Sequence, residues 1–183
     1  GREMATHGDK RVARNVYEKW LESRRREFPE MIERDSKAVR ICPFKVRHAV
    51  EWAKTLGKKE GGIIWVWHTE LGLWVMDAMR EAGIERAVHC PAGGASDHLL
   101  KQPDKCRDKV LVCSIASHGE AKNLQFLQRQ LVLQWPRMAK VCEQMVGRLH
   151  RNGQEADELV VDSCITTDFD GLLRSSSIND ALY

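Results

Sequence analysis

The alternation of short apolar segments with amphipathic helical segments most constrains what this chain can fold into. Ile63–Trp67 is a continuous, β-rich apolar run, as expected for a parallel strand covered on both faces. Further strand candidates lie at Arg86–Cys90, Lys109–Ser114, Gln130–Trp135 and Leu159–Cys164. Strands that alternate with helices predict right-handed βαβ crossovers. The predicted class is therefore α/β, with a parallel sheet flanked by helices.

Segments with the periodicity of an amphipathic helix separate these strand candidates. After the first strand one helical face carries apolar residues, namely Leu71, Trp74, Val75, Ala78 and Met79. Thr69 is a candidate N-cap for this helix, and Gly83 a candidate C′ residue. A later helix is expected from Pro136 through His150. Trp65, Trp67 and Trp74 fall in the strand or on the apolar helix face, which favours core packing over base stacking.

The periodicity divides the chain into three parts. Residues 1–45 form a helical N-terminal extension, whose first ten residues show no clear period and are compatible with a remnant of the expression vector. Residues 46–165 form the principal domain. Residues 166–183, rich in Ser and Asp, are expected to be a linker or a truncated helix.

Composition favours a globular intracellular protein. Hydrophobic residues make up 43% of the chain, and no segment approaches the roughly 20 apolar residues that a membrane helix needs. The six cysteines include no CxxC pair, which fits a reducing, cytoplasmic setting. The net charge is +3, but the first 60 residues carry about +6 and the remainder about −3, a weak sign of nucleic-acid binding.

The segment from Gln144 to Gln154, Gln-Met-Val-Gly-Arg-Leu-His-Arg-Asn-Gly-Gln, carries the most specific chemistry. Arg148 and Arg151 are three residues apart at the end of the expected helix, which predicts both guanidinium groups on one face. Such a pair can stabilise charge on a transferring γ-phosphoryl group, because arginine binds phosphate oxygens with a planar fork and stays protonated. Gly147 lets the backbone approach a nucleotide closely.

This segment resembles motif VI of superfamily 2 helicases: Gln, two residues, Gly-Arg, two residues, Arg. Its ending resembles that of the Swi/Snf-like branch and of related phage helicases. Upstream, Ser117–Gln125 reads Ser-His-Gly-Glu-Ala-Lys-Asn-Leu-Gln and resembles motif V of the same branch, with Ala121 where relatives often have glycine. The resemblance covers approximately residues 61–161.

The resemblance implies the second RecA-like lobe of an ATP-dependent DNA helicase or translocase, from a bacterium or a phage. It implies that Arg148 and Arg151 are catalytic and that Gln144 and Gly147 contact the nucleotide with them. Motif V implies DNA contacts, with duplex DNA preferred over RNA, from Ser117, His118, Gly119, Glu120 and Asn123. The chain lacks a Gly-x-x-x-x-Gly-Lys-Ser/Thr loop and an Asp-Glu-x-His box. ATP and Mg²⁺ are therefore expected to bind only together with a first RecA-like lobe, and this chain alone is expected to be inactive.

Other interpretations stay open. The same fold could serve as a non-catalytic nucleic-acid-binding or regulatory module. An α/β small-molecule transferase is also conceivable, but leaves the two motifs unexplained. The residues His89, Cys90, His98 and Cys106 lack the close paired spacing of structural zinc sites, so no metal site is predicted.

Overall fold

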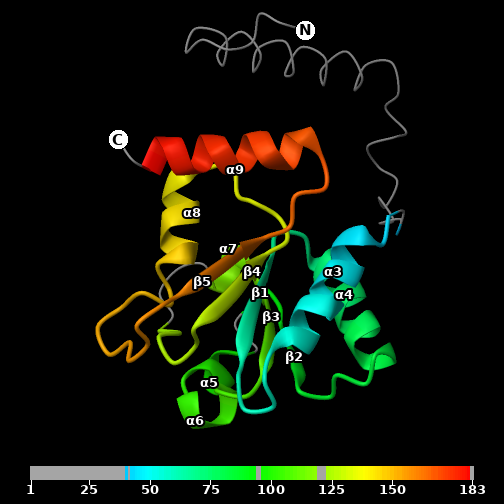
Figure 1. The fold of residues 1–183 in the computed structure, drawn as a ribbon, viewed down its shortest axis with the longest axis vertical. Coiled ribbons are helices and arrows are strands. Elements are labelled where there is room, and N and C mark those ends of the chain that lie inside the picture. The colour runs from blue at the N-terminus through cyan, green and yellow to red at the C-terminus, as the bar shows by residue number, and fades with distance from the viewer. Residues whose placement is uncertain (1–39, 41, 94–95, 119–122, 182–183) are drawn as a thin grey trace, which may run out of the picture. The chain divides into compact units, whose positions relative to one another are not determined.

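The described part of the chain forms a parallel sheet with helices on both faces. The computed structural model describes residues 40, 42–93, 96–118 and 123–181. Its five-stranded sheet has the order β2-β3-β1-β4-β5 (Figure 1), and neighbouring strands are parallel. The strands are β1 (Gly62–Val66), β2 (Ala87–Cys90), β3 (Val110–Ser114), β4 (Arg129–Val132) and β5 (Val160–Ser163). The predicted α/β class is confirmed, with strand boundaries that differ by a few residues.

Two groups of helices cover the two faces of the sheet. The first consists of α3 (Phe44–Thr55) and α4 (Thr69–Glu81). The second consists of α5 (Asp97–Leu100), α6 (Pro103–Cys106), α7 (Ile115–His118) and α8 (Ala139–Val146). Helix α9 (Asp168–Ala181) packs on α8. The predicted N-terminal helix lies in residues 1–39, outside the described residues.

The side chains of β1 alternate between two cores, which explains its unbroken apolar sequence. Ile64 and Val66 belong to the cluster under α3 and α4, whereas Ile63 and Trp65 belong to the cluster under α8. All four are almost completely buried. Successive strand residues point to opposite faces, so a strand covered on both sides needs apolar residues at every position.

The direction of the crossovers changes between β1 and β4. The chain leaves β1 through α4 toward β2, and it leaves β4 through α8 toward β5 on the other side. In open α/β sheets such a switch point leaves a crevice at the carboxyl ends of the strands. Loops at this edge are therefore well positioned for function.

Helix α4 ends in the way that its sequence predicts. Gly83 has a φ of 72°, its N–H donates to Arg80 O at 3.0 Å, and the N–H of Ile84 donates to Met79 O at 2.9 Å. This is the hydrogen-bond pattern of a Schellman motif. The predicted N-cap was wrong by one residue: Thr69 is already helical and His68 is the N-cap, because Gln134 Oε1 accepts the His68 N–H at 3.0 Å and fixes the turn there.

The C-terminal segment packs onto the lobe as a helix. The predicted helix over 136–150 is shorter, from Ala139 to Val146, because the chain around Pro136 is held by α9 instead. Ser177, which is completely buried, donates its hydroxyl to Pro136 O at 2.8 Å. Of the two alternatives for the tail, residues 168–181 adopt the helical one.

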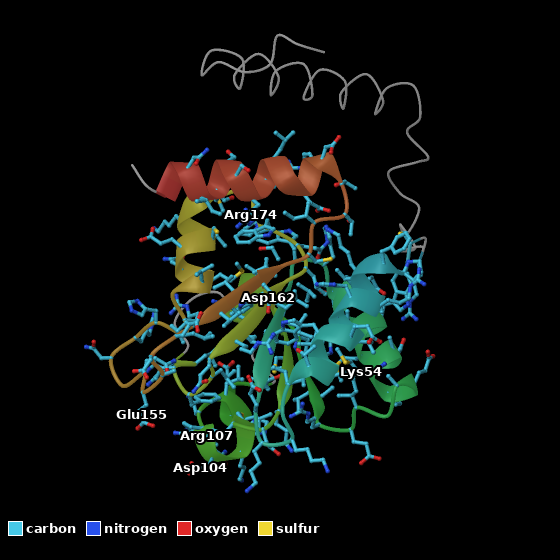
Figure 2. All side chains as sticks on the ribbon, in the orientation of Figure 1. Lys54, Asp104, Arg107, Glu155, Asp162 and Arg174 are labelled. Atoms are coloured by element: carbon cyan, nitrogen blue, oxygen red, sulfur yellow. The ribbon has the colours of Figure 1, made fainter. Side chains whose placement is uncertain are left out.

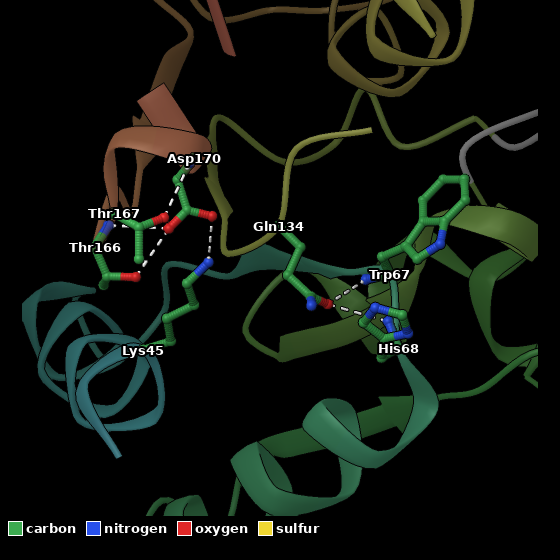
Figure 3. A network of polar contacts seen from close by, with 7 residues as sticks. All are labelled: Lys45, Trp67, His68, Gln134, Thr166, Thr167 and Asp170. Carbon is green, nitrogen blue, oxygen red and sulfur yellow. Dashed lines mark hydrogen bonds and ion pairs between the residues drawn. The ribbon is translucent and has the colours of Figure 1, made fainter. Parts of the chain in front are cut away.

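A partly buried ion pair ties α9 to α3. Lys45 Nζ lies 2.7 Å from Asp170 Oδ1, and Asp170 Oδ2 accepts from the backbone N–H and the hydroxyl of Thr166 (Figure 3). Burial opposes ionisation of Asp170, but the hydrogen bonds from Lys45 and Thr166 outweigh it and lower the pKa of this carboxyl to about 2. The ionised carboxylate therefore stabilises the docking of α9.

We expect Asp170→Asn to lower the free energy of unfolding by about 2 kcal/mol at neutral pH. A carboxyl whose folded pKa lies below its unfolded pKa stabilises the fold above the unfolded value and loses this contribution as pH falls through the folded value. Urea unfolding should therefore show the difference between wild type and variant shrinking from pH 4 to ~2. Asp168→Asn, at an exposed position on the same helix, is the control. An equal loss in both variants would contradict the ion-pair account.

Candidate functional site

Helix α8 ends before the two arginines of the motif VI segment. Gly147 is its C-cap, and a Cβ at this position would lie 3.0 Å from Glu143 O, closer than a side chain tolerates easily. Arg148 and Arg151 lie in the turns that follow. The prediction that they share one helical face was therefore wrong: Arg148 is 3% exposed, whereas Arg151 is exposed.

A glutamine amide holds the turn that carries Arg151. Gln154 Nε2 donates to Leu127 O and to Leu149 O, each at 3.0 Å, and Gln154 Oε1 accepts the N–H of Ala156 at 2.9 Å. One side chain thus ties the turn to the segment before β4. The sequence interpretation gave Gln154 no role, although its position in the His-Arg-Asn-Gly-Gln ending was a signal.

Two hydrogen bonds join the motif V segment to the motif VI segment. Arg151 Nη1 donates to Asn123 Oδ1 at 2.8 Å. In addition, the backbone N–H of Leu124 donates to the carbonyl oxygen of Arg148 at 3.3 Å. Two segments expected to bind different ligands therefore meet, and Asn123 fixes one edge of the Arg151 guanidinium.

Gln144, predicted to contact a nucleotide, carries an unsatisfied polar atom. It lies on α8, two residues before its last residue, and its Oε1 is buried with no hydrogen-bond partner among the described residues. A buried acceptor without a donor costs about 1–3 kcal/mol. Gln144 therefore has a free acceptor at the helix end that leads into Gly147 and Arg148.

The other end of the motif V segment lies at the carboxyl edge of the sheet. Ser117 and His118 belong to the short helix α7, which follows β3 directly. Ser117 Oγ accepts the N–H of Gly93, from the loop after β2, at 3.4 Å. Gly119 and Glu120 lie outside the described residues. The segment from Ser117 to Asn123 thus connects the carboxyl edge of the sheet to the Arg151 contact.

The carboxyl ends of β1 and β4 are joined by one glutamine. Gln134 Oε1 accepts the N–H groups of Trp67 at 2.9 Å and of His68 at 3.0 Å (Figure 3). Trp67 was predicted to be in the core, which was wrong: β1 ends at Val66, and Trp67 is 39% exposed. Trp65 is fully buried as predicted.

Other binding chemistry was sought in the part of the chain that the structure describes. No group of three or more His, Cys, Asp or Glu side chains there could hold a metal ion. The thiols of Cys90, Cys106, Cys113, Cys142 and Cys164 are buried. Burial raises the pKa of Cys142 to about 11, so this thiol stays protonated. None of the described helices is both long and apolar enough to cross a membrane.

Several solved structures share this fold. No family model and no curated protein sequence matches the chain. The C-terminal part of the Fun30 ATPase domain superposes with a TM-score of 0.62 at 16% identity, covering 86% of this chain and 53% of that one. The C-terminal domain of the DEAD-box protein Dbp5 gives 0.60 at 12% identity, covering 74% and 77%. T4 UvsW gives 0.53 at 13% identity, covering 76% and 31%.

Identities this low show the fold alone. The described part of the chain has the RecA-like α/β fold found in the C-terminal lobes of superfamily 2 helicases. The chain spans 53% of the Fun30 structure, so the activity of a whole protein of this kind is a matter for proposal.

Proposed function

We propose that this chain is the second motor lobe of an ATP-dependent DNA helicase or translocase. It would supply motif V and the arginine finger of motif VI to an ATP site that a first RecA-like lobe completes. The observation that carries this proposal is the 2.8 Å hydrogen bond from Arg151 Nη1 to Asn123 Oδ1 within a RecA-like fold. Among proteins of similar fold, S. cerevisiae Dbp5 has been solved with RNA and ADP BeF3 bound, and it covers 75% of this chain at a TM-score of 0.59.

Arg151 is the residue best suited to act on a nucleotide in another lobe. Its side chain is exposed, and Asn123 occupies one of its five N–H donors. The remaining donors can bind the oxygens of a γ-phosphoryl group, where they would offset the charge that develops in the transition state. The arginine does not have to lose a proton, so its contribution is electrostatic and positional.

Arg148, Gln144 and Gly147 keep their predicted nucleotide roles in this proposal. Gln144 Oε1 is buried and has no donor among the described residues, so the side chain would turn outward to accept from the nucleotide or from the partner lobe. Arg148 is 3% exposed, so its removal is expected to destabilise the fold as well as any active site. Arg151 is therefore the residue that tests the proposal cleanly. ATP phosphates and Mg²⁺ would be held mainly by the first lobe, because this sequence has no phosphate-binding loop.

The motif V segment would couple the nucleic acid to the nucleotide. Ser117, His118, Gly119 and Glu120 would contact DNA, and Asn123 would hold Arg151 at the other end of the segment. Of these four residues, Ser117 and His118 lie in α7, which follows β3 at the carboxyl edge of the sheet. Closure of the two lobes on ATP and their opening after hydrolysis would then move the DNA-binding surfaces relative to each other. We propose duplex DNA rather than RNA as the nucleic acid, and the cytoplasm of a bacterium or of a phage-infected cell as the setting. Both proposals rest only on the resemblance of the motif VI segment to the Swi/Snf-like branch and to related phage helicases.

We expect Asn123→Leu to lower DNA-stimulated ATP hydrolysis by the two-lobe protein about tenfold, because Arg151 loses a charge-assisted hydrogen bond and its position. Nucleotide affinity should change little. Asn152→Leu, an exposed asparagine in the adjacent turn with no hydrogen bond among the described residues, is the matched control. Equal turnover in the two variants would remove the coupling role of Asn123.

A further inference from the structure

A pocket of about 620 Å³ lies at the carboxyl ends of β1 and β4, beside the start of α9. The side chains that line it include Trp67, His68, Gln134, Arg137 and Phe169. Trp135 belongs to its buried wall, and Arg174 Cζ from α9 lies 5.8 Å from the centroid of the Trp135 ring. Figure 2 shows Arg174 at the end of the lobe opposite Asp104 and Arg107. The pocket therefore lies at the carboxyl edge of the sheet.

Trp67 presents an aromatic surface at this edge instead of filling the core. It is 39% exposed, although tryptophan side chains are on average largely buried. Its backbone is fixed, because Gln134 Oε1 accepts the N–H groups of Trp67 at 2.9 Å and of His68 at 3.0 Å. Figure 3 shows the indole on the side of Gln134 that faces away from the ion pair between Lys45 and Asp170. A flat ligand can stack on an exposed indole whose backbone is held in this way.

The same edge carries motif V residues that are proposed to contact DNA. Val66, the last residue of β1, pairs with Ser114, the last residue of β3. Helix α7 begins at the next residue and carries Ser117 and His118. Trp67, the residue after Val66, therefore lies beside the start of α7. A DNA strand held by α7 would pass close to the indole.

The charges of the pocket favour an anionic ligand. Asp170 is the one carboxylate among the described residues of its lining, and Lys45 Nζ, 2.7 Å away, offsets its charge. Arg137 is exposed and forms no ion pair in the part of the chain that the structure describes. Its Cζ lies 5.8 Å from the centroid of the Phe169 ring, and its N–H donors can still bind phosphate oxygens. Exposed aromatic surfaces beside an unpaired cation suit a nucleobase and its phosphate.

We propose that this edge binds unpaired nucleotides of DNA, with one base stacked on Trp67 and a neighbouring phosphate at Arg137. Phe169, which is 55% exposed, offers a second aromatic surface to another base. A base inside a duplex is covered on both faces by its neighbours, so only an unpaired base can reach the indole. Stacking accepts every base, so the binding has little sequence preference. This inference rests on the proposed function, which it narrows to DNA with a single-stranded segment next to duplex.

The test is fluorescence anisotropy of labelled oligo(dT) and of an abasic strand of equal length, each titrated with the chain. We expect wild type to bind oligo(dT) about tenfold more tightly than the abasic strand, because base stacking contributes only to the former. Trp67→Ala should bind both strands equally, and Trp67→Phe should restore part of the difference. Leu73→Ala, on α4 and similarly exposed at 40%, is the control and should keep the wild-type difference.

The dependence of binding on salt measures the phosphate contact. Arg137→Ala should lower the slope of log K against log salt concentration for oligo(dT) by about 0.7, the value for one phosphate contact on a single strand. The preference for oligo(dT) over the abasic strand should persist in this variant. Arg107→Ala, an exposed cation at the opposite end of the lobe (Figure 2), should leave the slope unchanged. Equal slopes in the two variants overturn the assignment of a phosphate to Arg137.

The outcomes separate this inference from the proposed function. Oligo(dT) binding involves no ATP, so Arg151→Ala should leave the affinity within about twofold of wild type. Wild type should bind a duplex with an oligo(dT) tail about tenfold more tightly than a blunt duplex, and Trp67→Ala should lose this preference. The stacking assignment is overturned if wild type binds no oligo(dT), binds the abasic strand equally well, or loses no more affinity in Trp67→Ala than in Leu73→Ala. None of these results bears on whether Arg151 accelerates hydrolysis, which a turnover measurement decides.

Discussion

Replacing Arg86 with methionine is expected to lower the free energy of unfolding by about 3 kcal/mol. Arg86 Nη1 donates to Gly57 O and Glu60 O, each at 2.7 Å, and to Asp108 O at 3.3 Å. Arg86 Nη2 donates to two carbonyls at the end of α3, those of Ala53 at 3.4 Å and Leu56 at 3.0 Å. Methionine fills a similar volume but removes all five hydrogen bonds and a cation from a helix C-terminus. Ala53 O and Gly57 O keep backbone donors from Leu56 and Glu60, whereas the other three carbonyls lose their described donor.

Urea unfolding at neutral pH measures this loss, with Arg80→Met as the control. Arg80 is 76% exposed and pairs with Asp77 at 3.4 Å, so its loss should cost less than about 1 kcal/mol. Arg86→Lys should recover part of the stability, because lysine keeps the charge but lacks the planar fork. Equal stabilities for Arg86→Met and Arg80→Met would show that the five carbonyls do not depend on Arg86.

Replacing Arg151 with alanine is expected to lower ATP turnover by the two-lobe protein about 10³-fold, the lower end of the range for arginine fingers. Nucleotide binding should persist, because the proposal gives the phosphates and the metal ion to the first lobe. Arg151 is exposed, and its side chain hydrogen-bonds Asn123 among the described residues, so the fold should be retained. Arg151→Lys should recover little activity, since a point charge cannot bind two phosphate oxygens as a planar fork does.

Periodicity predicted the sheet well, because the strands are short apolar runs and the central strands β1 and β3 are covered on both faces. The strand predicted at Ile63–Trp67 begins and ends one residue earlier in the structure, at Gly62–Val66. The strand predicted at 109–114 is observed at Val110–Ser114. Gly83 was predicted as the C′ residue of α4 and adopts the expected positive φ. Local patterns succeed here because neighbouring residues alone determine these features.

Tertiary hydrogen bonds determine the features that the sequence did not predict. Arg151 and Asn123 were both predicted as site residues, but 28 positions separate them and nothing in the local pattern indicates their contact. The turn after Gly147 depends on the Gln154 amide, which reaches Leu127 across the lobe. Arg86 was predicted only as the first residue of a strand, whereas its partners come from the segment 53–60 and from Asp108. Contacts distant in sequence leave no periodic signal.

The most direct test of the central claim is duplex-DNA-stimulated ATP hydrolysis by the polypeptide that carries both lobes, comparing wild type, Arg151→Ala and Lys140→Ala. Lys140 is an exposed cation on α8 with no ion pair among the described residues. The account predicts a fall of about 10³-fold for Arg151→Ala with ATP binding retained, and wild-type turnover for Lys140→Ala. Unchanged turnover in Arg151→Ala, or no hydrolysis by the wild type, would contradict the arginine-finger role and favour a non-catalytic nucleic-acid-binding module.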